Sequence, residues 1–487
     1  MYKRREAGKQ LEFVHFHLPF GGKLRADNRW VVKARLIPWG EIERRYSDEF
    51  SPSMGAPGIR ARVALGSLLI KEMLGLSDRE TVEQIRENPY LQYFLGFDRF
   101  HDEEPFDPSM FVYFRKRFPQ EVLIEINKLI VEAVAKEKPQ EPTSPPPQNE
   151  EREPDPDNQG KVITDASCTP ADIRFPTDLS LLNEAREKTE LIIDALHAPL
   201  VGKEKKPRTY REKAHRQYLG TAKKRRISSR ALRKAIGQQL RYINRNLNTI
   251  KELTGKTSLT LLPKGLYQNL LVASELYRQQ NELYKKRTHS IQGRIVSISE
   301  PHVRPIVRGK ASAPVEFGAK ISVSLDERGF AFLERLSFDP YNESLDLPMI
   351  IERYRERTGH YPESAHVDAI YRTRENRRYC KERNIRMSGP ALGRPRQLSS
   401  EEKAQASRDE RDRIPVEGCF GVAKRRYGLG RIRAHRADTS GCMIALTILV
   451  MNLEKIAKIF LSPFFSVISY LLRSLSNWFM CPYYQLP

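Results

Sequence analysis

A segment rich in proline and acidic residues divides the chain and limits how it can fold. Residues 139–160 contain seven prolines, six acidic residues, one basic residue and no large apolar side chain. A segment of this composition cannot bury a hydrophobic surface, so it predicts an extended linker over residues 137–160. We therefore expect one folded part before it, residues 1–136, and another after it, from residue 161.

Positive charge dominates the rest of the chain. The 83 Lys and Arg residues outnumber the 61 Asp and Glu residues, which gives a formal net charge of +22. Because the linker itself is acidic, the excess lies elsewhere and indicates a polyanionic partner, either nucleic acid or an acidic membrane face. The apolar content of 39% is enough for hydrophobic cores and excludes a wholly disordered chain.

Few signs point to a membrane or secreted protein. The longest uncharged apolar stretch near the C-terminus, residues 459–472, is shorter than the roughly 20 residues that a spanning helix needs. The first residues lack the apolar run of a secretory signal. The five cysteines are scattered and form no CxxC pair, which argues against disulfides or a zinc ribbon. We expect a cytoplasmic protein without a membrane anchor.

Residues 1–136 are expected to form an all-α domain. Apolar residues recur at helical spacing from Ile59 to Leu74, and Ser77 and Glu80 form a capping box that starts the next helix. Short helices joined by tight turns suit a helix-turn-helix DNA-binding module. They suit a module for packing or oligomerisation equally well, and the pattern alone does not decide between the two.

After the linker the hydrophobic period changes, and strands alternate with helices. A long polar helical region, about residues 178–300, interrupts this order and includes residues 203–236, with 14 Lys and Arg and two Glu. The order is typical of an α/β layer built on a mixed sheet. Pro415 is expected to break or restart the last polar helix. The expected elements are strands at 161–166, 319–325, 330–338, 365–369 and 385–388, and helices at 347–358, 374–383, 401–427 and 439–460.

Three acidic residues stand out by their expected positions. Asp165 is expected to end the first strand, Asp368 to end the strand after the hairpin, and Glu417 to lie on the helix that follows. Acids at the ends of neighbouring strands, with a helix crossing nearby, can converge on one edge of a sheet. Three converging carboxylates can hold two Mg²⁺ or Mn²⁺ ions, which prefer hard oxygen ligands. The alternative is that these acids are solvated loop residues.

Basic residues surround the third acid. Arg413, Glu417 and Lys424 are spaced four and seven apart, so a continuous helix carries all three on one face. Such a face would set a carboxylate between cations that can bind phosphate. An ordinary Arg–Glu pair at this spacing is the simpler alternative.

Several separated motifs along the chain belong together. They are Arg308-Gly-Lys310, Glu316-Phe-Gly-Ala-Lys320, Val367-Asp368, and a run that holds Arg413-Ile-Pro-Val-Glu417 and Lys424-Arg-Arg-Tyr-Gly. Together they resemble the DDE transposases of bacterial insertion sequences, in particular the IS5/IS1182-like group of the IS4/IS5 superfamily. The resemblance covers about residues 25–460. The position that holds tyrosine in the family, three residues before the arginine, is Glu410 here.

This resemblance implies a fold and a catalytic site. The fold is an RNase H-like catalytic core over residues 161–461 with a large α-helical insertion, preceded by the all-α N-terminal domain. Asp165, Asp368 and Glu417 are the implied catalytic triad and the implied ligands of two Mg²⁺ or Mn²⁺ ions. The apolar tail, residues 462–487, falls outside the resemblance.

The activity that the resemblance implies is transposition. Such a protein binds the terminal inverted repeats of its element as double-stranded DNA, cleaves the ends with metal-dependent chemistry and joins them to target DNA. It is expected to act as a homodimer on DNA in the bacterial cytoplasm, associated with the nucleoid. The alternatives are a metal-dependent nuclease without strand transfer and an inactive DNA-binding derivative.

Two groups of cations are expected to contact DNA. One surrounds the implied third ligand, and the other lies in the long helical region. Tyr210 and Tyr218 lie among the second group and could stack on a distorted base, or could simply pack within their helices. The cations are Arg413, Lys424, Arg425 and Arg426 in the first group, and Lys223, Lys224, Arg225 and Arg226 in the second.

Overall fold

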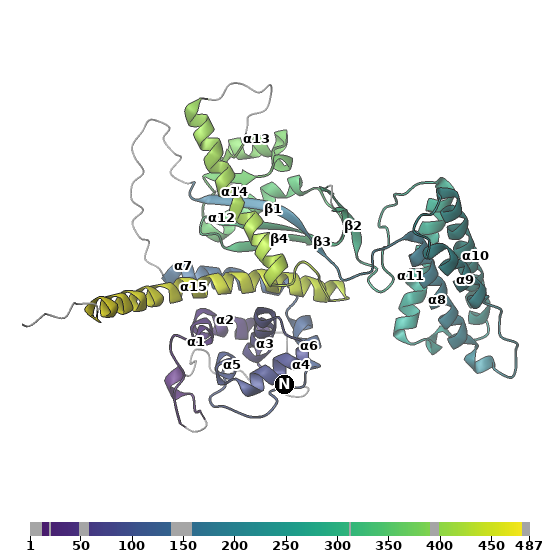
Figure 1. Cartoon of the computed structure of the whole chain (residues 1–487), viewed down its shortest axis with the longest axis horizontal. Helices are drawn as coiled ribbons and strands as arrows, with labels where there is room; N and C mark the ends of the chain where they lie inside the picture. Colours follow the sequence, from purple (N-terminus) through teal and green to yellow (C-terminus); the bar gives the residue numbers. More distant parts are fainter. Residues whose placement is uncertain are drawn as a thin grey trace, which may run out of the picture.

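The structure is a computed structural model, and it describes residues 12–18, 21–47, 58–137, 158–310, 313–389 and 399–479. It contains a group of short helices near the N-terminus, a sheet flanked by helices, and a separate bundle of helices (Figure 1). The mixed α/β class that the sequence predicts is confirmed. The predicted linker over residues 137–160 lies almost wholly outside the described residues.

The N-terminal part is helical. Ser77 starts one helix as predicted, because its side chain accepts a hydrogen bond of 3.1 Å from the backbone N–H of Glu80. The sequence pattern did not predict three of the helices, α1, α2 and α5, each of which has nine residues or fewer. The helices are α1 (Arg29–Leu36), α2 (Trp39–Ser47), α3 (Ala61–Leu74), α4 (Asp78–Glu87), α5 (Pro89–Phe94), α6 (Met110–Arg117) and α7 (Gln120–Glu137).

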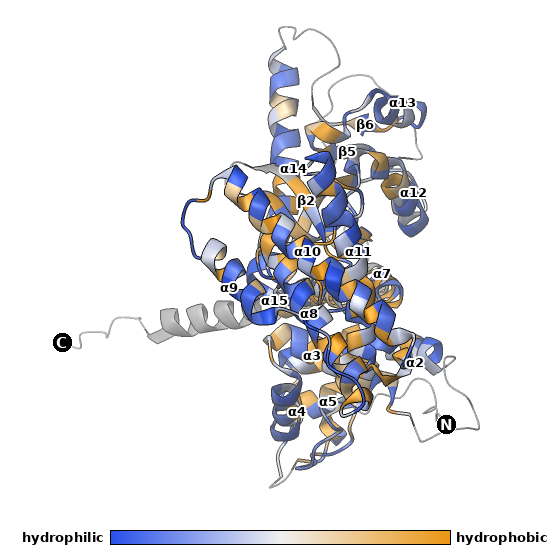
Figure 2. Cartoon of the chain, turned by 90° about the vertical axis from the view of Figure 1, so that its right-hand side faces the viewer, coloured by the Kyte–Doolittle hydropathy of each residue, from blue (hydrophilic) through white to orange (hydrophobic). Residues whose placement is uncertain are grey.

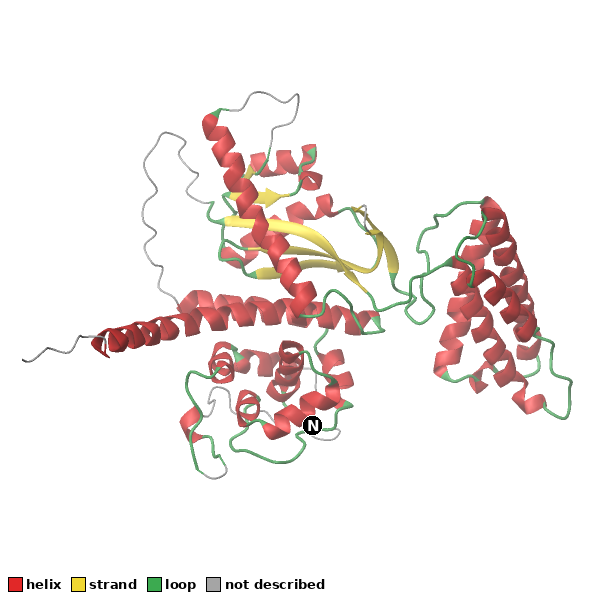
Figure 3. Cartoon of the chain, viewed as in Figure 1, coloured by secondary structure: helices red, strands yellow, loops and turns green. Residues whose placement is uncertain are grey.

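The sheet is mixed and is built around its central strand, β1. The strands are β1 (Lys161–Pro170), β2 (Arg304–Lys310), β3 (Ala313–Leu325), β4 (Ala331–Ser337), β5 (Ser364–Val367) and β6 (Arg386–Met387). Their order is β2-β3-β1-β5-β6, and β4 also pairs with β3 as the second strand of the predicted hairpin (Figure 3). β1 is antiparallel to β3 and parallel to β5.

β1 is longer than the sequence predicts. Asp165 was expected to end it, and this is wrong because β3 is long enough to pair with β1 as far as Pro170. Pairing with β5, in contrast, stops at Thr164. Asp165 is therefore the residue at which β1 loses its parallel neighbour but keeps its antiparallel one.

Two helices pack on the sheet beside β5 and β6, and two long helices cross or underlie it. The first two are α12 (Leu347–Thr358) and α13 (Arg374–Glu382), and the long pair is α14 (Ser400–Arg426) and α15 (Ala437–Phe479). α14 is continuous through Pro415, so the predicted break at this residue is wrong. Proline removes one backbone donor from the helix. The buried side chains of Val416, Phe420 and Ala423 hold the following turns against the sheet.

α15 joins the N-terminal helices to the sheet. It lies between them and runs beside α7 (Figure 1). Apolar side chains of the N-terminal helices, β3, β4, α14 and α15 belong to one continuous hydrophobic core. A buried ion pair adds to this contact, because Nζ of Lys33 on α1 lies 2.5 Å from Oε1 of Glu454 on α15. The N-terminal helices and the sheet therefore form one packed body.

The C-terminal helix extends beyond its predicted end. The sequence predicts an apolar helix over residues 439–460, and α15 continues to Phe479. Within the described ranges, no helix combines the length and the apolar character that crossing a membrane requires. Residues 480–487 lie outside the described part of the chain.

Between β1 and β2 the chain forms a helical bundle that stands beside the sheet (Figure 1). These helices bury their apolar side chains against one another. Hydrophilic and hydrophobic stretches alternate along them (Figure 2), as expected for amphipathic helices. The bundle consists of α8 (Asp178–His197), α9 (Arg211–Ala222), α10 (Ser229–Thr254) and α11 (Lys264–Lys286).

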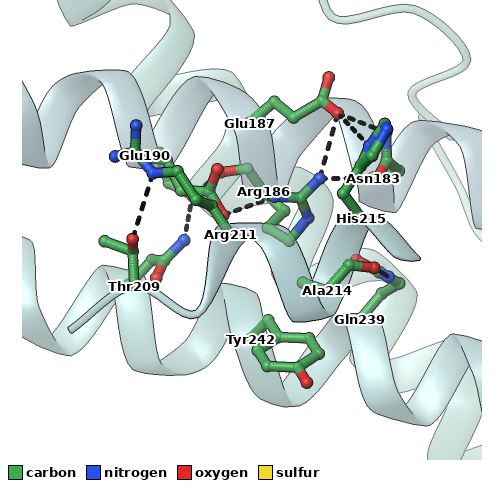
Figure 4. A network of polar contacts seen from close by, with 12 residues as sticks. Asn183, Arg186, Glu187, Glu190, Thr209, Arg211, Ala214, His215, Gln239 and Tyr242 are labelled. Atoms are coloured by element: carbon green, nitrogen blue, oxygen red, sulfur yellow. Dashed lines mark hydrogen bonds and ion pairs between the residues drawn. The ribbon is translucent and has the colours of Figure 1, made fainter. Parts of the chain in front are cut away.

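Part of the positive charge of the bundle is used inside it. Arg186 on α8 is 1% exposed, and its guanidinium donates to Glu190 at 2.5 Å and to Glu187 at 3.1 Å (Figure 4). Arg211 on α9 pairs with Asp194 on α8 at 2.7 Å. Both arginines pair with acids of α8, although only Arg186 is buried and Arg211 is 43% exposed.

Candidate active site

Asp165 and Asp368 follow the last pair of residues that joins β1 to β5. The parallel register pairs Lys161 with Ser364 and ends where Thr164 pairs with Val367. The next residue of each strand is an aspartate. Because adjacent strands lie about 4.8 Å apart, the two acids are neighbours at the carboxyl ends of the parallel strands.

Both aspartates point to the face of the sheet that α14 covers. Side chains alternate along a strand, so Ile163 and Asp165 share one face of β1. Ile163 packs in the core that includes α14 and α15, whereas Val162 packs on the other face in the cluster that includes α12. Asp368 follows His366 by two residues and shares its face in the same way.

Each aspartate accepts one local hydrogen bond. Oδ1 of Asp165 accepts from the backbone N–H of Ala166 at 2.8 Å, and Oδ1 of Asp368 accepts from that of Ala369 at 2.7 Å. Burial raises the pKa of Asp165 to about 6, and the negative charges of Asp368 and Glu343 add to this effect. The Ala166 hydrogen bond and the charge of Arg413 act in the opposite direction. The pair thus places two negative charges side by side, with Asp165 partly buried and Asp368 exposed.

Glu417 on α14 pairs with Arg413, and Arg413 also interacts electrostatically with Asp165 and Asp368. Nη2 of Arg413 lies 3.1 Å from Oε1 of Glu417 and 3.2 Å from Oε1 of Glu410. Burial lowers the pKa of Arg413, but the charges of Glu410, Glu417 and Asp368 outweigh it and leave this pKa raised. Glu417 is 57% exposed, because it stands on the flank of α14 next to the buried face. The arginine therefore links the third acid to the aspartate pair.

The donor set fits a divalent metal at the two aspartates. Asp165 and Asp368 offer hard carboxylate oxygens, and the local hydrogen bonds leave one oxygen of each available. Burial is the main cause of the raised pKa of Asp165, and the charges of Asp368 and Glu343 add to it, so a bound cation would favour the charged form of this carboxyl group. Among the residues that the structure describes, no group of three or more His, Cys, Asp or Glu side chains is arranged as a set of metal ligands. Glu417 instead pairs with Arg413.

The cations after Glu417 lie at the end of α14. Arg425 and Arg426 are exposed, and the guanidinium of Arg426 lies 5.2 Å from the ring centre of Tyr427. Lys424 is half-buried on the same turn. These residues extend the positive surface of α14 away from the Arg413–Glu417 pair.

The second group of predicted DNA contacts lies on the bundle. Lys223, Lys224, Arg225 and Arg226 are exposed in the loop between α9 and α10, which we call the 223–226 loop. None of the four forms an ion pair within the described part of the chain, so their charge faces solvent. The bundle stands beyond the β2 side of the sheet, apart from α14 (Figure 1).

The two tyrosines of the bundle differ in environment. Tyr218 is 9% exposed and packs with Leu179 and Ala235, so the structure supports the packing alternative for this residue. Tyr210 is 39% exposed, and the guanidinium groups of Arg208 and Arg245 lie 5.5 Å and 4.6 Å from its ring centre. Only Tyr210 of this pair offers an accessible ring.

Two charged residues near the aspartates were not predicted from the sequence. Glu343 lies in a short 3₁₀ turn (Glu343–Asp346), forms an ion pair with Lys320 on β3, and raises the pKa of Asp165. Nη2 of Arg372 donates to the carbonyl oxygen of Val367 at 3.0 Å, directly before Asp368. Neither residue belongs to a periodic pattern, so no signal in the sequence distinguishes them from exposed charges.

Two regions of the chain match known protein families. Residues 365–454 match the family described as "Transposase DDE domain". Residues 19–117 match the family described as "Transposase domain (DUF772)". The first match contains Asp368, Arg413 and Glu417, and the second covers most of the N-terminal helices. The chain belongs to the DDE transposases of bacterial insertion sequences.

The IS5/IS1182-like group agrees with these matches, and the chain is also similar to one curated protein. The transposase is 34% identical over 155 residues to "Uncharacterized protein ORF8 in nfe locus" of Rhizobium meliloti. The matched region is 32% of this chain and 68% of that protein. No solved structure matches the transposase.

Proposed function

We propose that this transposase cleaves the ends of its insertion sequence and joins them to target DNA, with Asp165, Asp368 and Glu417 as its catalytic acids. Transposases act on DNA, and the family membership supports that partner for this chain. The finer steps of binding terminal inverted repeats, hydrolysis and strand transfer are part of the proposal.

The neighbouring positions of Asp165 and Asp368 are the observation that carries the proposal. They occupy the first place beyond the β1–β5 pairing, on the face that α14 crosses. This arrangement supports an RNase H-like core, in which distant parts of the sequence bring acids to one edge of a mixed sheet. A cation bound there would also offset the cost of partly burying the charge of Asp165.

Asp165 and Asp368 would hold Mg²⁺ or Mn²⁺, with Glu417 as the third ligand. When bound, such ions activate a water or a 3′-hydroxyl and neutralise charge on the leaving oxygen at phosphorus. Arg413 would release Glu417 and turn its guanidinium to a phosphate near the scissile bond. The exchange is possible because a guanidinium binds carboxylates and phosphates through the same planar pair of N–H donors.

Further cations would hold the flanking DNA. Lys424, Arg425 and Arg426 continue from the acids along α14, and the 223–226 loop presents four exposed cations on the bundle. These two groups of cations would form two separate surfaces that bind DNA. The homodimer on DNA is also part of the proposal, and it rests on the family resemblance alone.

Strand transfer separates this proposal from a simple nuclease. Purified protein would be given Mn²⁺ and DNA fragments that carry the inverted repeats found next to the gene. The proposal predicts cleavage at the repeat ends, and joining of pre-cleaved ends to a plasmid. Cleavage without joining would support a nuclease, and neither reaction with tight DNA binding would support an inactive derivative.

A further inference from the structure

Two acids of α14, Asp409 and Asp412, lie within the helical turn before Arg413 and pair with cations from neighbouring strands. Nζ of Lys161 on β1 donates to Oδ1 of Asp412 at 2.8 Å. Nη1 of Arg386 on β6 donates to both carboxylate oxygens of Asp409 at 2.9 Å. His366 on β5 is 1% exposed and lies between the two acids, with ring nitrogens 3.8 Å from Asp409 and 3.9 Å from Asp412. We call these five residues the clasp.

The clasp sits on the same sheet face as the aspartate pair. Lys161, Ser364 and Arg386 form one row across β1, β5 and β6 in the parallel register. Along β1, Asp165 follows Lys161 by four residues and therefore shares its face. Oγ of Ser364 also lies 3.0 Å from Nε2 of His366. Each of the three strands thus contributes a basic side chain beneath α14, just before the strands reach the acids.

The clasp matters because Pro415 interrupts the backbone hydrogen bonding of α14. Proline has no backbone N–H, so α14 lacks one hydrogen bond of its ladder at this residue. Arg413 lies before this gap and Glu417 after it. After the gap, Val416, Phe420 and Ala423 hold the helix by apolar packing.

Before the gap, the sheet-facing side of α14 is polar. Asp409 is buried and Asp412 is part-exposed, and no other residue between Ser400 and Asp412 is buried. Ionic contacts therefore replace apolar packing in this half of the helix. Without them, the first half of α14 would be free to pivot at Pro415.

We propose that the clasp positions Arg413, which ends the first half of α14, against Glu417 and beside the aspartate pair. The role of Asp409 and Asp412 is thus to fix the rotation of α14 rather than to contact substrate. This inference rests on the proposed function, because it assumes that Glu417 joins the aspartates. Fixed rotation matters, since neighbouring helix positions point about 100° apart and a small turn of the first half moves Arg413 away from Glu417 and the aspartates.

The test uses Asp409→Asn and Asp412→Asn, with the exposed Glu401→Gln on the same helix as a matched control. Because misplacement of a catalytic group by about 1 Å costs up to about a hundredfold, single-turnover cleavage should slow by about tenfold or more in the clasp variants. DNA affinity should stay unchanged. In metal-free protein, backbone hydrogen exchange should quicken only in the half of α14 before Pro415, and unchanged exchange elsewhere would show that the rest of the chain remains folded.

An exchange of charges tests the pairing itself. Lys161→Asp and Asp412→Lys should each slow cleavage, and the double variant should recover most of the lost rate. The proposal would be overturned if the Asn variants cleave DNA and exchange hydrogen at wild-type rates. It would also be overturned if the double charge-exchange variant cleaves as slowly as the single variants. Normal cleavage by Glu417→Gln would instead contradict the proposed function, while the hydrogen-exchange result would still decide the role of the clasp.

Discussion

Substitution of Glu72 on α3 would test how the N-terminal helices pack on α15. Its carboxylate accepts a hydrogen bond of 2.8 Å from Oγ1 of Thr447. Burial raises the pKa of this carboxyl group to about 7, from an ordinary value of 4.5. The folded state therefore binds the proton more tightly than the unfolded state does. The stability that protonation contributes is full below pH 4.5 and is lost as the pH rises to about 7.

The magnitude follows from this difference in pKa. At about 1.4 kcal/mol for each pKa unit, the change from 4.5 to about 7 corresponds to about 3 kcal/mol. This is the amount by which the charged carboxylate destabilises the folded state above neutral pH. Glu72→Gln removes the charge and keeps an oxygen that can accept the hydrogen bond. We expect it to raise the free energy of unfolding by about 3 kcal/mol at pH 8 and by about 1 kcal/mol at pH 5.

Hydrogen exchange measures this effect where it arises. A chain of this length is not expected to unfold in one step, so amides of α3 and α15 report the local opening better than a global melt does. Glu87→Gln, which alters an exposed acid at the end of α4, is the matched control. Equal stabilisation by Glu72→Gln at both pH values, or a loss of stability at pH 8, would refute the account of a buried carboxylate.

Three further variants test other parts of the structure. Arg413→Gln removes the ion pair to Glu417, and we expect single-turnover cleavage to slow by about tenfold to a hundredfold with a smaller change in DNA affinity. Replacing the four cations of the 223–226 loop with Gln should lower the slope of log affinity against log salt by up to about four in a DNA-binding titration, and an unchanged slope would remove the loop from the DNA surface. Asn452→Ala leaves the buried N–H of Ala331 on β4 without its partner at 2.8 Å. It should cost about 2 kcal/mol and quicken hydrogen exchange at the Ala331 amide, and unchanged exchange there would contradict this contact.

The sequence predicts those elements of the fold that a local pattern of residues determines. The hairpin of β3 and β4 follows from alternating residues around Gly329, whose φ of 73° suits the turn. The sequence predicts the helix that carries Glu417 over residues 401–427, although with a break at Pro415 that α14 does not have. The class of the fold follows from the order of strands and helices. In each case neighbouring residues settle the outcome.

The sequence does not predict features of the fold that depend on contacts between residues far apart in the chain. The end of β1 depends on the length of β3, more than 140 residues away, so Asp165 could not be recognised as an internal residue of the strand. Continuity of α14 at Pro415 depends on packing against the sheet. The clasp unites three strands with one helix, and its members look like ordinary surface charges when taken one at a time.

The central claim is that Asp165, Asp368 and Glu417 act as one catalytic unit. The most direct measurement is Mn²⁺-dependent cleavage of a DNA fragment bearing the element's end, by the wild-type protein and by Asp165→Asn, Asp368→Asn and Glu417→Gln. Asp339→Asn, which alters a largely exposed acid of the same sheet region, is the control. The account predicts that each of the three variants binds the DNA and fails to cleave it, while the control cleaves normally. Cleavage at the wild-type rate by any of the three would contradict it.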